Sequence, residues 1–165
     1  MSTVRRRVAA LARASARRER LEPELRTALE ARRSERLALQ AQADDMALRL
    51  LELEALALDH RARITRMMTG EEPFSLDAFD GCRRYLDIID TQRQEAEAAL
   101  DAQRVLVAAK DDEMSAARRE IALNRGRIDV CRKRVHELEN LLEQAALEAE
   151  DEAAEELVLA RRSKA

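Results

Sequence analysis

A seven-residue repeat of apolar positions runs through the second half of the chain and limits what it can fold into. Its first series starts at Phe79, recurs every seven residues to Ala149, and is broken by a charge only at Arg93. A second series, three residues later, starts at Cys82 and ends at Ala145. This spacing predicts a coiled-coil helix, which we expect from about residue 76 to about residue 160.

The first half carries a weaker repeat of the same kind. Its two series begin at Leu25 and Leu29, and most of their positions are apolar or small. Traced backwards, the pattern fails between Ser15 and Glu22, beside Pro23, whose ring clashes with the preceding helical turn. We expect a first helix from about residue 4 to about residue 68, with a kink or a restart at Pro23.

Residues 69–75, Thr-Gly-Glu-Glu-Pro-Phe-Ser, form the clear break between the two repeats. Gly70 suits a helix C-cap, and Ser75 or Asp77 can cap the start of the next helix. A short loop between two long helices makes them antiparallel neighbours. The expected fold class is therefore all-α, a long two-helix antiparallel coiled-coil hairpin that forms one domain over residues 1–165.

Composition leaves little material for a wider core. Aromatic residues are 2% of the chain, Ala alone supplies 31 of its residues, and only three Gly and two Pro are available for turns. Such a chain fills a narrow seam and not a globular interior that encloses a pocket. We therefore expect a protein that is not an enzyme and binds no cofactor.

Metal and membrane sites are not expected either. His60 and His136 are the only histidines, and neither stands at metal-ligand spacing. Cys82 and Cys131 would lie about 73 Å apart on one helix, too far for a disulfide. No apolar segment approaches the ~20 residues that span a bilayer, and the Arg-rich start lacks the apolar run of a secretory signal. These features indicate a soluble, cytoplasmic protein.

Charge and polarity are distributed unevenly. Residues 1–20 hold seven Arg and one Glu, whereas residues 137–156 hold nine acidic residues and no Lys or Arg. In a hairpin the start of the chain lies near residues 124–140, so we expect the opposite charges to attract weakly. Polar residues at seam positions either fix the register of the pair or loosen the seam. They are Arg32, Arg36, Arg93, Gln103, Lys110 and Asn124.

The aromatic residues gather around the predicted turn. Phe79 occupies a heptad position, whereas Phe74 fits none, and Tyr85 lies between the next two positions of the repeat, Cys82 and Leu86. Together with Leu76, they form either a plug that closes the seam or a docking tip in which Phe74 is an exposed anchor.

In length, turn position and charge layout the chain resembles the stalk proteins of type III secretion systems, the FliJ/YscO (SctO, Hrp-type) family. In that family the terminal ends of the hairpin enter the pore of a hexameric secretion ATPase, and the turn points toward the export gate. The resemblance implies a non-enzymatic bacterial stalk that couples the ATPase to the cytosolic domain of the export gate, at the cytoplasmic face of the inner membrane. Such a stalk would promote ATPase assembly and activity and virulence-associated protein export, and the resemblance also implies secretion chaperones as partners.

The resemblance also implies two sets of partner-binding residues. The candidates for the ATPase pore are Arg5, Arg6, Arg7, Arg13, Arg17, Arg18, Leu142 and Leu159. The candidates for the export gate are Phe74, Leu76 and Phe79. Pro23 and the long acidic tail match no shared motif of that family.

Two other functions fit the same residues. A structural or scaffolding coiled coil would oligomerise through the same seam. A nucleic-acid-binding protein would lay the arginines of residues 5–20 along a phosphate backbone. Nucleic acid is the least favoured partner, because this segment lacks the base-reading Asn of basic-zipper proteins and Pro23 would interrupt the continuous helix that such proteins need.

Overall fold

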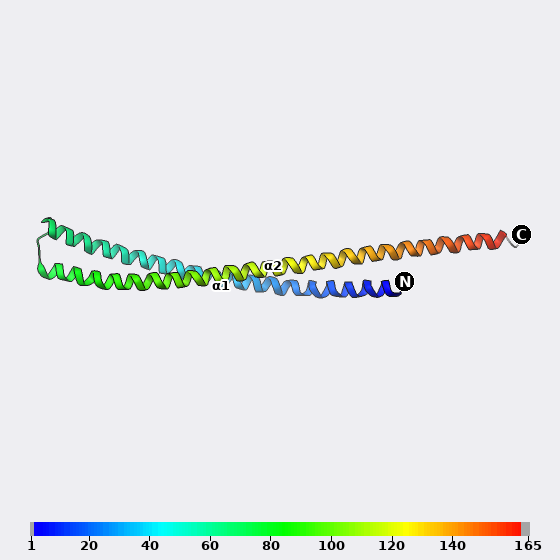
Figure 1. Cartoon of the computed structure of the whole chain (residues 1–165), viewed down its shortest axis with the longest axis horizontal. Helices are drawn as coiled ribbons and strands as arrows, with labels where there is room; N and C mark the ends of the chain where they lie inside the picture. Colours follow the sequence, from blue (N-terminus) through cyan, green and yellow to red (C-terminus); the bar gives the residue numbers. More distant parts are fainter. Residues whose placement is uncertain (1, 163–165) are drawn as a thin grey trace. The chain divides into compact units, whose positions relative to one another are not determined.

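Two long helices make up nearly all of residues 2–162, the part of the chain that the structure, a computed structural model, describes (Figure 1). Helix α1 is Ser2–Thr69 and helix α2 is Leu76–Arg162. Within residues 2–162 there is no strand. The helices run antiparallel and pack against each other, which confirms the predicted all-α hairpin fold.

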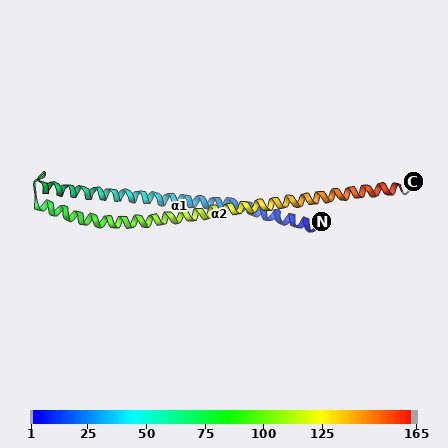
Figure 2. The same cartoon turned by 45° about the horizontal axis from the view of Figure 1, so that its top comes forward.

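The chain divides into two compact units, each an antiparallel pair of helical segments. The terminal unit joins Met1–Leu29 to Ala116–Ala165, and the turn unit is Glu30–Ser115. Within the terminal unit, Figures 1 and 2 show the end of α2 continuing past the start of α1. The terminal unit is therefore a helix pair followed by a single-helix extension.

The seam between the helices follows the heptad repeat. Among the described residues of α2, each buried side chain belongs to one of the two series predicted from the sequence. In the turn unit Leu53, Ala57 and Ile89 are at most 5% exposed, and Leu86 and Ala96 pack against them. Burial of these side chains at a spacing of three and four is what holds the helices together.

The burial of α2 ends before the helix does. Leu142 and Ala145 are half-buried, whereas every residue of 146–159 is exposed, including Ala149 of the predicted series. The prediction that Ala149 lies in the seam is wrong, because α1 has 68 residues and α2 has 87. The repeat continues in the sequence beyond the point where its partner helix has ended.

Two buried amides bond across the seam, one in each unit. In the turn unit Gln103 donates from Nε2 to the Leu39 carbonyl and to Gln42 Oε1, both at 3.0 Å. In the terminal unit Asn124 donates from Nδ2 to the Arg18 carbonyl at 3.0 Å. A buried amide without a partner costs about 1–3 kcal/mol. The bond to the Gln42 side chain depends on register, because backbone carbonyls like those of Leu39 and Arg18 recur along α1. The Gln103–Gln42 bond therefore supports the register-fixing interpretation.

The charged seam residues of the turn unit pair with acids. Arg36 Nε lies 3.1 Å from Asp111 Oδ1, and Lys110 Nζ lies 2.8 Å from Glu113 and 2.7 Å from Glu35. The carboxylates of Glu113 and Glu35 raise the pKa of Lys110, and the Lys110 ammonium lowers the pKa of Glu35. Both shifts favour the charged forms, so the pairing is retained at neutral pH.

Helix α1 continues through Pro23, so a helix restart at this position is wrong. The seam also continues, but with polar groups: Ser15 is 6% exposed and Glu22 is half-buried. Ser15 Oγ donates to Glu19 at 2.7 Å, and Thr27 Oγ1 donates to the Pro23 carbonyl at 2.9 Å. The apolar pattern fails here, but the helix pairing persists. The hydrogen bonds of Ser15 and Thr27 lie on either side of the position where Pro23 removes an N–H donor.

Replacing Leu53 or Ile89 with Ala should lower the free energy of unfolding by about 2–3 kcal/mol, because each change leaves a cavity in the seam. The matched control is Leu58→Ala on the same helix, where the side chain is 64% exposed and the change should cost less than about 0.5 kcal/mol. Urea unfolding followed by circular dichroism measures both. Equal losses of unfolding free energy at Leu53 and Leu58 would contradict the assignment of Leu53 to the buried seam.

Candidate partner-binding surfaces

The turn is held to the end of α1 by its own backbone and by ion pairs. Gly70 has a φ of +84°, which confirms its predicted role as the C-cap, because side chains disfavour this conformation. The Glu72 N–H donates to the Arg66 carbonyl at 3.1 Å. The Glu72 carboxylate lies 3.1 Å from Arg63 Nε and 3.6 Å from Arg66 Nε. These contacts fix the path of the loop that leads to Phe74.

The start of α2 presents an apolar tip. Ser75 caps the helix: its Oγ accepts from the Ala78 N–H at 3.4 Å and its carbonyl accepts from the Phe79 N–H at 2.9 Å. Phe74 and Leu76, on either side of the cap, are 58% and 64% exposed. Phe79 is half-buried, and its ring centroid lies 5.8 Å from that of Phe74. The three predicted export-gate residues thus lie together, with Phe79 supporting Phe74.

Two further side chains near the turn are exposed: Tyr85, which the sequence analysis grouped with the tip, and Met68, which it missed. Met68 is 67% exposed, because Met67 takes the seam position beside it. Tyr85 is 59% exposed and stacks on His60, with ring centroids 5.3 Å apart and planes 11° apart. The signal for Met68 was present in the heptad assignment, which places Met67 inward and its neighbour outward.

The predicted ATPase-pore residues do not form one continuous surface. Arg18 is half-buried and Leu142 is half-buried in the seam, whereas Leu159 is 63% exposed on the extension of α2. Leu142 and Leu159 are separated by 17 residues, about 25 Å along the helix. The remaining candidates are exposed on α1, and none of them is in an ion pair with another described residue. They are Arg5, Arg6, Arg7, Arg13 and Arg17.

The ion pairs of the terminal unit run opposite to the expected direction. Glu22 Oε1 of α1 lies 2.8 Å from Arg125 Nε, and Glu19 Oε1 of α1 lies 3.2 Å from Arg132 of α2. Among the described residues no ion pair joins an arginine of residues 5–20 to an acidic residue of 137–156, so the weak attraction between these segments stays a prediction. The α2 segment opposite Arg18, Glu19 and Glu22 is itself basic, and six of the nine acidic residues of the tail lie in the unpaired extension.

Two segments within the paired part of the terminal unit are strongly basic. Residues 2–20 hold seven Arg and one Glu, and residues 117–136 hold seven basic and two acidic residues. We call these two segments the basic pair, whose net charge is +11. Residues 146–159, the acidic extension, hold six acidic residues and no Lys or Arg. One compact unit thus carries two surfaces of opposite sign.

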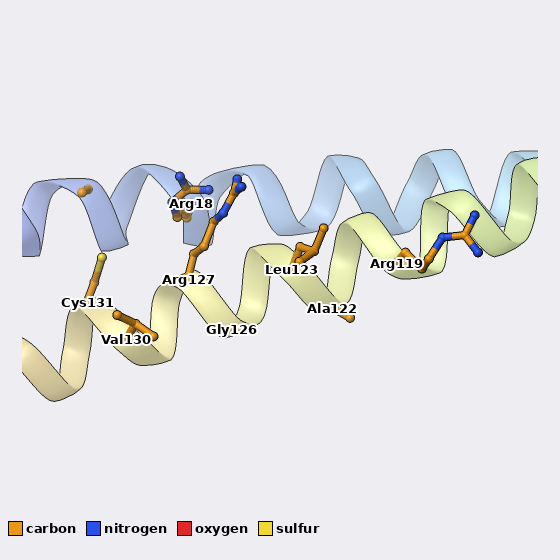
Figure 3. Close-up of a pocket in the computed structure, with 9 residues that line it drawn as sticks. Arg18, Arg119, Ala122, Leu123, Gly126, Arg127, Val130 and Cys131 are labelled. Carbon is orange, nitrogen blue, oxygen red and sulfur yellow. The ribbon is translucent and has the colours of Figure 1, made fainter.

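An open groove of about 850 Å³ lies on the basic pair (Figure 3). Its floor is apolar, with Gly126 between Leu123 and Val130, which are 61% and 69% exposed. Its rim is basic: Figure 3 shows Arg18 on α1 and Arg127 on α2 at one stretch of the groove, with Arg119 farther along α2. We call this feature the arginine groove. It is lined by Ala14, Arg18, Arg119, Ala122, Leu123, Gly126, Arg127, Val130 and Cys131.

No group of histidine, cysteine and acidic residues within residues 2–162 could hold a metal ion. Cys82 is buried in the turn unit, Cys131 is half-buried in the terminal unit, and both are free thiols. None of the helices in the described part of the chain is long and apolar enough to cross a membrane. The surfaces that the structure offers are therefore the apolar tip, the basic pair, the arginine groove and the acidic extension.

Exposed apolar and charged surfaces of this kind are typical of sites that contact other macromolecules. The family model described as bacterial type III secretion protein (HrpB7) matches residues 6–162, nearly the whole chain. The chain therefore belongs to this family and is a type III secretion component. No curated protein and no solved structure matches it.

Acidification should weaken the terminal unit through Glu22. Hydrogen bonds from Arg125 and Arg26 lower the pKa of Glu22 below its ordinary value of 4.5. A carboxyl whose pKa is lowered by folding adds stability above its ordinary pKa and loses it as the pH falls through the folded value. The urea concentration at the midpoint of unfolding should therefore decrease as the pH is lowered from about 7 to about 3.

The variant Glu22→Gln should lower the midpoint at neutral pH and reduce its dependence on pH. The matched control is Glu24→Gln, two residues away, because Glu24 is in no ion pair with another described residue. Urea midpoints measured by circular dichroism at the two pH values, for wild type and both variants, test this expectation. A pH dependence that is the same in wild type and in Glu22→Gln would show that the pairing contributes nothing.

Proposed function

We propose that this protein is the central stalk that couples the secretion ATPase to the export gate and promotes ATPase assembly and activity. The observation that carries the proposal is the antiparallel hairpin in a type III secretion family. A hairpin places both chain ends in one unit and the turn in the other, so each unit presents a different partner-binding surface.

The basic pair supports an assignment to the ATPase. Its arginines at residues 5–17 are exposed, and none is in an ion pair with another described residue, so they are free to contact carboxylates of a partner. Charge-driven contacts of this kind are individually weak and exchange readily, which suits a shaft that meets successive subunits of a ring.

The apolar tip supports an assignment to the cytosolic domain of the export gate. Exposed aromatic and aliphatic side chains on a narrow end are typical anchors of an interface, because they bury much apolar area with few ordered side chains. Phe74 and Leu76 expose more than half of their surface. The structural scaffold and the nucleic-acid binder, the two alternatives, would not need this tip.

The first prediction from the proposed function separates the two ends. Replacing Arg5, Arg6 and Arg7 with Ala should reduce binding to the purified ATPase, and stimulation of ATP hydrolysis, about tenfold. Binding to the export-gate cytosolic domain should stay unchanged. The matched control replaces Arg33, Arg49 and Arg104 with Ala. These side chains are exposed and form ion pairs only with acidic residues of their own helix. An ATPase that neither binds nor responds to the wild-type protein would refute the stalk.

The second prediction concerns the tip. Replacing Phe74 and Leu76 with Ala should weaken binding to the export-gate domain about tenfold and reduce secretion, while stimulation of the ATPase is retained. The control is Leu58→Ala with Val105→Ala, two side chains exposed to a similar extent elsewhere on the turn unit. If the tip variant lost ATPase stimulation and kept gate binding, the assignment of the two ends would be reversed.

A further inference from the structure

The terminal unit carries both halves of an electrostatic contact that it does not make with itself. The basic pair has a net charge of +11, and the acidic extension adds six carboxylates without a basic residue. Arg18, Arg119 and Arg127, on the rim of the arginine groove, are in no ion pair with a described residue. Cations gathered around an apolar floor need anions to lower their mutual repulsion.

The floor of the groove fits a helix. Gly126 has no Cβ, and no atom lies within 4 Å of where a Cβ would stand, so another backbone can approach closely. Leu123 and Val130, seven residues apart, lie on the same side of α2 and are both largely exposed. An amphipathic helix laid along the groove would cover both side chains.

The acidic extension has the matching properties. Leu147, Ala154 and Val158 stand at positions i, i+7 and i+11, which lie on one face of a helix. Leu147 and Val158 are 62% and 52% exposed, because α1 does not reach this part of α2. Carboxylates flank this face, including Glu148, Glu152 and Glu155.

We propose that two copies of this chain associate antiparallel, with the acidic extension of each copy packed into the arginine groove of the other. Antiparallel pairing about a two-fold axis near residue 140 would set residues 148–159 of one α2 opposite residues 120–131 of the other. The contact is then isologous, and both copies bury the same surface. Parallel pairing would instead place like charges together.

A second copy is the occupant that charge and length favour. The groove needs an amphipathic helix with acidic flanks, and the same unit supplies one of the required length. This association uses the outer surface and leaves the seam within each chain, unlike the scaffold that oligomerises through its seam. The inference does not rest on the proposed function, since no ATPase or export gate enters its test.

A charge swap tests the association in the full-length protein. The groove variant is Arg119→Glu with Arg127→Glu, and the tail variant is Glu152→Arg with Glu155→Arg. Wild type should form a dimer at low salt in sedimentation equilibrium and dissociate at about 1 M salt, where the Debye length is about 3 Å. Each variant alone should be monomeric. An equimolar mixture should form a heterodimer, because the reversed charges of one variant's groove then face the reversed charges of the other variant's tail.

Matched controls separate this surface from general effects of charge. Arg83→Glu with Arg84→Glu makes the same change on α2 within the turn unit and should leave the dimer intact. Leu123→Ala with Val130→Ala should weaken association about tenfold, whereas Leu106→Ala with Val105→Ala, a similarly exposed pair, should not. Circular dichroism verifies that each variant is helical.

Three outcomes would overturn the inference. A monomeric wild type at tens of micromolar and low salt would show that the second copy is not the occupant of the groove. Dimers that persist in both charge variants would place the contact on another surface, such as the seam. Two monomeric variants whose mixture stays monomeric would show that groove and tail do not meet each other.

Discussion

A pair of helices buries one stripe of each, and this constraint governs the rest of the structure. Side chains outside the two heptad series have no interior to enter, so more than half of the surface of many large apolar residues is exposed. A single exposed Leu on such a helix is ordinary. What distinguishes the apolar tip and the arginine groove is that several such side chains lie together and next to a defined backbone or charge feature.

The same narrow seam makes register a problem that apolar residues alone do not solve. A slip of one heptad would replace Leu or Ala by similar residues at most positions of the seam. It would, however, separate Gln103 Nε2 from the Gln42 side chain, whereas the carbonyls of Leu39 and Arg18 would be replaced by equivalent carbonyls one heptad away. The Gln103–Gln42 bond therefore helps to distinguish registers that packing scarcely separates. The short capped turn acts in the same direction.

The heptad repeat was sufficient to predict the fold class and the buried side chains of α2, because side-chain burial in a helix pair depends only on the period. The caps at Gly70 and Ser75 were equally local and equally predictable. Ala149 was assigned wrongly because its burial depends on where the partner helix ends. The ion pairs of Glu19 and Glu22 with α2 could not be predicted for a related reason, since they depend on the stagger between the helices, which a periodic pattern does not report.

The arginine groove could not be found from the repeat, because most of its residues lie outside the seam positions and they come from both helices. It nonetheless links the two proposals. A dimer would cover the acidic extension and part of the basic pair, the surface proposed for the ATPase. The ring would then bind only the monomeric fraction, and its apparent affinity would fall in proportion to that fraction. Salt screens the charges in both the dimer contact and the ATPase contact. The apolar floor formed by Leu123 and Val130, which the second copy covers, adds a contact that does not depend on charge.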